Sequence, residues 1–528
     1  MLATVLSSTI VGLDGRVIRV EVDVAPGLPG FTIVGLADAA LQEARERTRG
    51  AIRNAGFSHP PRRITVNLAP AELRKAGASL DLAIAIGILL GSEQVRSRDG
   101  RIALVGELSL SGEVRPVPGV LPMVAALRRR GVGRVIVPAP CAAEGRLVPG
   151  VEIVGVRTLA EAVDAIRRRH GAGRVAPRRL ELAGEDDGSE ASGDAFSDNR
   201  ADAPPGEIPD LAEVRGQLEA RRALEIALAG GHGLLLAGPP GSGKTLLART
   251  IPGLLPPLDD TEALAATIVA SVAGEGPIDR LQRRAPVRSP HHTLSYAAMV
   301  GGGPRLSPGE VTLADHGVLF LDELPEFTRD VLEALRQPLE DGHVTIARVG
   351  RATRFPARFQ LVAAMNPCPC GMAGDPEGSC TCSVGVPERY TGRISGPLRD
   401  RIDLWVTMPR VAPAAVVSGG EPEASSVVAA RIALARAVQR SRSGRLNGRL
   451  TGRALRAACQ LTPAARAHAV ALANLEALSG RGTERLLRVA RTIADLAGEE
   501  SVAERHLAEA SRFRTPAARH GLHAVTAR

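Results

Sequence analysis

A phosphate-binding loop in the middle of the chain constrains the fold more than any other feature. The apolar run 234–237 has the composition of a buried strand, and a helical run at 246–249 follows the loop. The residues between them match G-x4-G-K-S/T, in which glycines let backbone N–H groups approach phosphate oxygens. This order predicts a P-loop NTPase domain that holds a nucleotide through Gly238, Pro239, Pro240, Gly241, Ser242, Gly243, Lys244 and Thr245.

Two side chains of this loop predict ATP and Mg²⁺ as cofactors. Lys244 would neutralise the β- and γ-phosphate oxygens, and the Thr245 hydroxyl would ligate magnesium. Of the 66 lysines and arginines in the chain, only Lys75 and Lys244 are lysines. A lysine at this position is therefore not a by-product of the basic composition.

Two further apolar strands end in polar groups that suit ATP hydrolysis. The run 317–321 ends at Asp322 and Glu323, which predicts a magnesium ligand followed by the group that activates water. The run 360–365 ends at Asn366, whose amide can hydrogen-bond the γ-phosphate or the attacking water. The alternatives are a solvated strand end for the acidic pair and the start of an Asn-Pro turn for Asn366.

Five arginines are candidates for contacts with the γ-phosphate. Arg401 is predicted to reach the nucleotide of an adjacent subunit as an arginine finger, with Arg399 and Arg393 as rivals for that role. Arg481 or Arg485, at the start of a C-terminal helix, is predicted to reach the pocket as sensor 2. In a chain this rich in arginine, a solvated helix arginine is the alternative in each case.

Composition divides the chain into four parts. Residues 1–170 alternate short strands with Ala-rich helical runs, which predicts one α/β domain. Residues 171–209 are rich in Gly, Ser, Asp and Glu and predict an acidic flexible linker. Strands flanked by helices return at 210–412, and 425–514 has a helical pattern without strands, as expected for a lid domain.

The bulk composition predicts a soluble cytoplasmic protein. The longest apolar stretch, 82–90, is far shorter than the roughly 20 residues that a bilayer span needs. The N-terminus has no basic region before its strand pattern, so no signal peptide and no membrane partner are expected. Residues 431–528 hold 18 Arg against 7 Asp plus Glu, a balance that suits a phosphate-bearing partner.

Four of the six cysteines fall within one short stretch, and six are too few for a disulfide scaffold in a chain of 528 residues. The four are Cys368, Cys370, Cys380 and Cys382. They supply the number of thiolates that a tetrahedral structural zinc site needs. A reduced loop without metal and redox chemistry are the alternatives. His291 and His292 have no cysteine or carboxylate at ligand spacing, so we interpret them as part of an insert.

Two stretches of the central part have the pattern of hairpins that touch a substrate. The first tip is expected at 299–303, between the phosphate loop and the acidic pair. The second is expected at 344–355, where Arg348, Arg351 and Arg354 lie near the tip and suit a DNA phosphate backbone. A solvated hairpin tip is the alternative. Aromatic residues are 2% of the chain, so base stacking would contribute little to such binding.

Six separated blocks resemble the magnesium-chelatase-like AAA+ proteins of the YifB/ComM type. The blocks are 26–36, 67–70, 289–293, 308–310, 315–326 and 366–371. The resemblance implies an N-terminal domain with the Lon-protease-like fold, a central AAA+ module and a C-terminal helical lid. It also implies a homo-hexameric ring and, for ComM-type members, an ATP-driven DNA helicase that promotes branch migration during recombination of incoming DNA.

Two other functions remain as alternatives. A Lon-type peptidase would use Ser79 as nucleophile with a lysine downstream, but Leu121 stands where the resemblance places that lysine. We therefore expect no peptidase substrate. A magnesium-chelatase motor subunit, or an ATPase that remodels proteins, would share residues 210–512. The domain before them favours the YifB/ComM type.

Overall fold

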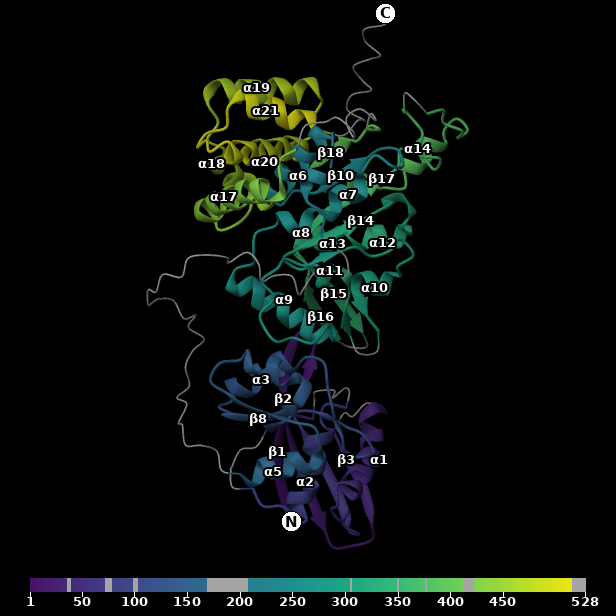
Figure 1. Cartoon of the computed structure of the whole chain (residues 1–528), viewed down its shortest axis with the longest axis vertical. Coiled ribbons are helices and arrows are strands. Elements are labelled where there is room, and N and C mark those ends of the chain that lie inside the picture. The colour runs from purple at the N-terminus through teal and green to yellow at the C-terminus, as the bar shows by residue number, and fades with distance from the viewer. Residues whose placement is uncertain are drawn as a thin grey trace, which may run out of the picture.

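The computed structural model describes most of the chain as three regions that follow one another along the long axis of the molecule (Figure 1). The predicted linker at 171–209 lies outside the described residues except for its last two, and Lys75 lies outside them as well. The described residues are 1–35, 39–71, 78–97, 103–168, 208–303, 306–348, 351–375, 378–411 and 422–514.

The N-terminal region is built on a seven-stranded mixed sheet with the order β3-β4-β2-β1-β5-β8-β9. Its first two strands pair antiparallel from Leu2 opposite Asp23 to Val11 opposite Asp14. In β2, buried Ile18, Val20, Val22 and Val24 alternate with charged neighbours, which explains the alternating pattern in the sequence. The strands are β1 (Leu2–Val11), β2 (Asp14–Ala25), β3 (Gly30–Val34), β4 (Arg63–Ala69), β5 (Ala103–Leu104), β8 (Arg134–Pro138) and β9 (Glu152–Val156).

The helices of this region cover the sheet. The apolar stretch at 82–90 is the core helix α2, which is buried on nearly all sides and not a membrane segment. No helix in the described ranges combines the length and apolar character needed to cross a membrane. The helices are α1 (Ala39–Asn54), α2 (Asp81–Gly91), α3 (Val120–Arg129), α4 (Ala142–Arg146) and α5 (Leu159–Arg167), and β6 (Glu107–Leu108) pairs with β7 (Val114–Arg115).

Ser79 and Leu121 lie in different surroundings in the N-terminal region. Ser79 is buried just before α2, and its hydroxyl donates to the backbone oxygen of Ser8 at 3.4 Å. Leu121 is buried in the apolar cluster around α3, and its backbone N–H donates to the Glu144 carboxylate at 2.7 Å. That Ser79 has no peptidase role stays a prediction.

The central region is built on a five-stranded sheet with the order β11-β14-β17-β10-β18, in which all paired strands are parallel. The carboxyl ends of β10, β14 and β17 therefore meet at one edge of the sheet, where α/β proteins bind their ligands. The predicted strands at 234–237, 317–321 and 360–365 are confirmed. The strands are β10 (Leu234–Ala237), β11 (Val287–Arg288), β14 (Val318–Leu321), β17 (Gln360–Met365) and β18 (Leu404–Thr407).

Both predicted hairpins are present in the central region, but the expected tip of the first at 299–303 is displaced, because 299–300 end helix α10 (Tyr296–Val300) and 301–302 form the first strand. The first joins β12 (Gly301–Gly302) to β13 (Ser307–Pro308), and the second joins β15 (His343–Arg348) to β16 (Arg351–Pro356). The helices of the region are α6 (Leu218–Gly230), α7 (Lys244–Arg249), α8 (Ile251–Leu254), α9 (Asp260–Ala273), α10 (Tyr296–Val300), α11 (Glu310–Leu313), α12 (Arg329–Ala334), α13 (Arg336–Asp341), α14 (Val386–Thr391) and α15 (Gly396–Arg399).

The C-terminal region is helical, as predicted. It shares one apolar core with α6 and β10 of the central region, so lid and sheet pack as a continuous unit. Ser479 caps α20 by accepting a hydrogen bond from the Gly482 N–H at 3.1 Å. The helices are α17 (Ser425–Ser443), α18 (Gly452–Cys459), α19 (Pro463–Leu475), α20 (Gly480–Leu496) and α21 (Glu504–Arg512).

Many lid arginines are paired inside the chain, which weakens the inference from the net charge of residues 431–528. These arginines bind carboxylates of the lid itself or of the central region, so their charge is not displayed as one basic face. The pairs are Arg431 with Glu225 and Glu423, Arg440 with Asp259 and Glu262, Arg442 with Asp495, Arg485 with Asp400, Arg488 with Asp403, Arg491 with Asp495, and Arg514 with Glu476.

The N-terminal region touches the central region through α9 and β16 (Figure 1). The Gly119 N–H donates to the Ser271 oxygen at 2.8 Å, and the Ser271 hydroxyl donates to the buried carboxylate of Glu144. Gly12, at the turn between β1 and β2, packs against Thr353 of the β15–β16 hairpin. A hairpin predicted to touch the substrate therefore also contacts the N-terminal region.

Candidate nucleotide site

The phosphate loop connects β10 to α7 at the carboxyl edge of the central sheet. Gly241 and Gly243 have φ values of +78° and +91°, a conformation that favours glycine. A Cβ atom on Gly238 would lie 2.2 Å from the backbone oxygen of Met408, so only glycine fits against the end of β18. The local sequence thus produces the compact loop that the motif predicts.

Lys244 connects the phosphate loop to the end of the neighbouring strand. Its ammonium group donates to the backbone oxygens of Gly238 and Pro239 at 2.7 and 2.9 Å, and to Asn366 Oδ1 at 3.2 Å. Burial lowers the pKa of Lys244, and the nearby carboxylates of Asp322 and Glu323 oppose that shift. The structure therefore brings Asn366 to the phosphate loop, where a polar group after β17 can contact a γ-phosphate.

The two expected magnesium ligands face each other. The Thr245 hydroxyl donates to Asp322 Oδ2 at 2.7 Å, across the gap between α7 and β14. The other oxygen of Asp322 accepts the Glu323 N–H at 2.9 Å, so the carboxylate is held on both sides. A hydroxyl and a carboxylate are hard oxygen ligands of the kind that Mg²⁺ prefers. These two residues therefore fit Mg²⁺ and would hold it.

Glu323 has a partner that the sequence interpretation missed. His292 Nδ1 lies 3.2 Å from Glu323 Oε2, and the His292 ring lies edge-on to Phe327 with centroids 6.5 Å apart. Glu323 also has φ of +52°, which is uncommon outside glycine. The sequence alone places His291 and His292 only in an insert. Because His292 precedes the β12–β13 hairpin, it connects that insert to the group expected to activate water.

Arg401 is paired within its own chain. Its guanidinium lies 2.6 Å from Glu340 Oε2 of α13. The Arg401 side chain is 22% exposed and that of Glu340 is 56% exposed, so the ion pair lies at the edge of the fold with its arginine largely buried. That Arg401 acts on an adjacent subunit stays a prediction.

The rivals of Arg401 differ in how firmly they are held. Arg399 donates to the backbone oxygen of Ile394 at 3.0 Å and to that of Thr391, so it supports the fold of its own loop. Arg393 donates to the backbone oxygen of Pro325 at 3.1 Å, and its side chain is 56% exposed. Arg393 therefore remains a candidate for a contact in trans, whereas Arg399 has a structural use.

The sensor 2 candidates lie at the start of α20. Arg485 donates to the backbone oxygens of Arg399 and Ile402 at 3.3 and 3.2 Å, and it pairs with Asp400 at 3.2 Å. Arg485 thus attaches the lid to the loop that carries Arg401. Arg481 is exposed, and it remains the candidate for a lid contact with the nucleotide.

A cavity of about 710 Å³ lies along the phosphate loop. Its walls come from the loop, from the segment 213–217 before α6, and from Met372 and Arg410. Gln217 crosses behind the loop, where its side-chain amide donates to the backbone oxygens of Ser242 and Pro409 at 3.1 and 2.6 Å. Gly241 and Gly243 of the phosphate loop line this cavity, whereas Lys244, Thr245 and Asp322 are not among its lining residues. We infer that it receives the nucleotide on the glycine side of the loop, and we call it the nucleotide cavity. The phosphate-loop motif does not predict the wall formed by Met372 and Arg410, because these two residues are distant from the loop in sequence.

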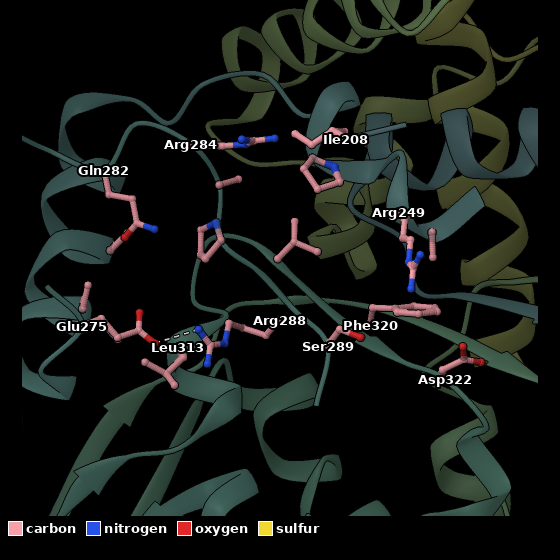
Figure 2. Close-up of a pocket in the computed structure, with 18 of the residues that line it drawn as sticks. Ile208, Arg249, Glu275, Gln282, Arg284, Arg288, Ser289, Leu313, Phe320 and Asp322 are labelled. Atoms are coloured by element: carbon pink, nitrogen blue, oxygen red, sulfur yellow. Dashed lines mark hydrogen bonds and ion pairs between the residues drawn. The ribbon is translucent and has the colours of Figure 1, made fainter. Parts of the chain in front are cut away.

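A second cavity, of about 870 Å³, is lined by residues of α7 and borders the expected magnesium ligands. Figure 2 shows Asp322 and Arg249 at one end of this cavity and the ion pair of Arg288 with Glu275 at the other. Thr245 also lines it. The two expected magnesium ligands, Thr245 and Asp322, are therefore accessible from this second cavity.

The structure brings the four clustered cysteines together. Cys368 Sγ lies 3.3 Å from Cys370 Sγ and 3.8 Å from Cys380 Sγ, and Cys370 Sγ lies 3.6 Å from Cys380 Sγ. All four sulfur atoms, Cys382 included, lie within 4.8 Å of one another. All four cysteines are free thiols. This arrangement can hold a metal ion.

Comparison with known proteins shows the family. Residues 210–416 match the profile "Magnesium chelatase, subunit ChlI", residues 20–140 match "Subunit ChlI of Mg-chelatase", and residues 422–514 match "Magnesium chelatase, subunit ChlI C-terminal". The chain is 39% identical to the competence protein ComM of Haemophilus influenzae, over 97% of each chain. The chain belongs to the magnesium-chelatase-like YifB/ComM family.

Two further relatives differ in how much of the chain they match. The chain is 44% identical to an uncharacterised protein of Mycobacterium tuberculosis, over 98% of this chain and 99% of the relative. It is also 31% identical to Lon protease 2 of Bacillus subtilis, but over only 23% of this chain and 22% of that protein. The family is one of AAA+ proteins, so the chain has the architecture of an ATPase, and its similarity to Lon is partial.

Proposed function

We propose that this protein is an ATP-driven ring motor that acts on DNA, as a helicase or branch-migration factor of the ComM type. The reaction is the hydrolysis of ATP to ADP and phosphate. The nucleotide part of the proposal is supported by the meeting of three strand ends, which brings Lys244, Asp322 and Asn366 together at one edge of the sheet.

Each group at this edge has one task in the proposed hydrolysis. Lys244 and the loop N–H groups bind the phosphates, while Thr245 and Asp322 hold Mg²⁺, which would neutralise the charge that develops on them. Glu323 accepts a proton from the attacking water, and Asn366 orients that water or the γ-phosphate. Arg401 would enter from the adjacent subunit and stabilise the charge of the transition state.

The DNA part of the proposal rests on the full-length similarity to a competence protein. A homo-hexameric ring would place Arg401 of one subunit at the nucleotide of the next. The β15–β16 hairpin supports contact with DNA, because Arg348 and Arg351 are paired in register at its tip and Arg354 is exposed on β16. We expect the protein to act in the cytoplasm during recombination or natural transformation.

Two further parts of the proposal concern the N-terminal region and the clustered cysteines. The N-terminal region, expected to end near residue 170, would have a Lon-protease-like fold without peptidase activity. Its partial similarity to Lon protease 2 supports this. The cysteine cluster would hold Zn²⁺ as a structural ion.

Replacing Arg348, Arg351 and Arg354 with glutamine should remove the stimulation of ATPase activity by DNA and leave the rate without DNA little changed. The three lie on the β15–β16 hairpin, and the phosphate loop, Asp322 and Asn366 follow strands of the central sheet. DNA binding by the wild type should weaken steeply with salt, and each lost phosphate contact should reduce the slope of log K against log salt by about 0.9. Fluorescence anisotropy with labelled DNA at several salt concentrations measures this slope.

A triple lid variant is the matched control, with Arg453, Arg456 and Arg466 replaced by glutamine. These arginines are exposed in the described part of the lid, and the variant loses the same charge as the hairpin variant. It should keep the stimulation and the salt slope of the wild type. If both variants lost the stimulation equally, DNA binding would depend only on the net charge of the protein. If the lid variant alone lost it, the DNA contact would lie on the lid.

A further inference from the structure

The cysteine cluster has the dimensions of a four-thiolate zinc site. Zinc binds thiolates at about 2.3 Å, which sets the sulfur–sulfur edge of a tetrahedron at about 3.8 Å. Three of the six sulfur–sulfur distances are 3.3, 3.6 and 3.8 Å, and the three to Cys382 are at most 4.8 Å. The Ala373 N–H donates to Cys368 Sγ at 3.3 Å. Hydrogen bonds of this kind to a ligand atom stabilise a metal-bound thiolate. Four sulfur ligands and no nitrogen or oxygen ligand favour zinc among the common divalent ions.

The loop that carries the cluster begins directly after Asn366, at the end of β17, and packs against the phosphate loop. Gly371 has φ of +81°, and a Cβ atom there would lie 2.4 Å from Pro240 Cδ. The cysteine loop therefore approaches the phosphate loop so closely that no side chain fits between them. Its position constrains the position of Pro240.

The same loop forms one wall of the nucleotide cavity. Met372 lines the cavity, and its sulfur lies 3.1 Å from the guanidinium of Arg410, which also lines it. Arg410 is held from the other side by Asp375 at 2.7 Å, and the Asp375 side chain is only 3% exposed. Met372 of the cavity wall, Asp375 of the ion pair and the cysteine cluster thus belong to one short segment.

We propose that Zn²⁺ bound by the cysteine cluster fixes this wall, so that metal occupancy sets the affinity of the phosphate loop for nucleotide. This inference rests on the proposed ATPase function and on the proposed structural zinc. Binding of the metal by four thiols releases their protons, and no oxidation is involved. Without the metal, the loop has fewer restraints, and ordering Met372 and Arg410 around a nucleotide then costs conformational entropy.

Metal content tests the site itself on the purified full-length protein. Mass spectrometry of the elements should find about one zinc per wild-type chain, and Co²⁺ in its place should give the absorption bands of tetrahedral thiolate coordination. The Cys380→Ser/Cys382→Ser double variant should contain no zinc. The Cys141→Ala variant removes a buried cysteine of the N-terminal region and should keep its zinc. Iron in place of zinc, or no metal in the wild type, would overturn the proposal.

Nucleotide affinity tests the coupling without the need for turnover. Titration with a fluorescent ADP analogue should give a Kd about tenfold higher for the double variant than for the wild type. A reversible thiol reagent with a chelator should remove zinc from the wild type and raise the Kd equally, and added Zn²⁺ should restore it. This second route remains informative if the double variant unfolds. Equal Kd values with and without zinc would contradict the coupling.

Lys244→Ala protein separates failure of this inference from failure of the proposed function. It should contain one zinc per chain and bind no nucleotide, because the lysine is lost and the cysteines are intact. A wild-type protein that contains zinc and binds no nucleotide would refute the ATPase and the coupling together, but not the metal site.

Discussion

Lys244→Ala should abolish nucleotide binding, whereas Glu323→Gln should bind ATP and hydrolyse it at least about a hundredfold more slowly. Lys244 is the cation of the phosphate loop, and it contacts the loop and Asn366 together. Glu323 contacts neither the loop nor Thr245 in the interactions of the described residues, and its expected role begins only when water attacks. The Lys244 variant therefore loses ATP binding, and the Glu323 variant loses only the activation of the attacking water.

Equilibrium binding of a fluorescent ATP analogue and a phosphate-release assay measure the two effects separately. Lys75→Ala removes the other lysine of the chain and should match the wild type in nucleotide binding. Equal loss of ATP binding in the Lys244 and Glu323 variants would contradict the assignment. It would show that Glu323 supports the pocket and does not activate water.

Arg401→Ala should leave ATP binding by the isolated chain intact and lower hydrolysis by about a thousandfold or more, as expected for a finger in trans. The structure adds a control, because Arg401 is paired with Glu340 of its own chain. Glu340→Gln removes that pair and keeps the arginine. If Arg401 acts on a neighbour, Glu340→Gln should hydrolyse ATP at a rate near that of the wild type.

Mixing the subunits of two inactive variants tests the trans role directly. In a ring of Arg401→Ala and Lys244→Ala subunits, the first kind supplies an intact phosphate loop and the second an intact Arg401. Activity should therefore return at the interfaces that combine the two. Native mass spectrometry shows whether rings contain both kinds of subunit. Mixed rings that hydrolyse no ATP, or a Glu340→Gln variant as inactive as Arg401→Ala, would contradict the finger.

The nucleotide strands could be predicted because their signals are local. An apolar run that ends in Asp322 or Asn366 identifies a strand end, and parallel pairing then brings separate strand ends to one edge. The contact of His292 with Glu323 depends on how an insert folds back across that edge. Periodicity along the chain contains no such information, so this partner of Glu323 was missed.

The net charge of a segment predicted the roles of its arginines poorly. A net count over residues 431–528 treats every arginine as available, but Arg442 and Arg491 both pair with the buried Asp495. Arg485 holds the loop of Arg401 and does not line the nucleotide cavity. Which carboxylate an arginine meets depends on tertiary packing, and the chain contains many of both.

The cysteine cluster illustrates a third kind of limit. Spacing alone gave four thiols in one stretch, and it left open whether they meet. The fold brings their sulfur atoms within 4.8 Å of one another and places the loop against the nucleotide cavity. The relation between a metal site and the phosphate loop follows from Gly371 and Pro240, which are distant in sequence and packed together in space.

The most direct test of a DNA motor is the steady-state ATPase rate of the wild-type protein, measured at low salt with no DNA and with single-stranded, duplex or forked DNA. We predict that at least one DNA form raises the rate, that added salt suppresses the increase, and that Glu323→Gln protein shows none. A wild-type rate that no DNA form changes at low salt would contradict the proposal. The partner would then have to be sought among proteins or porphyrins, as for a chelatase motor.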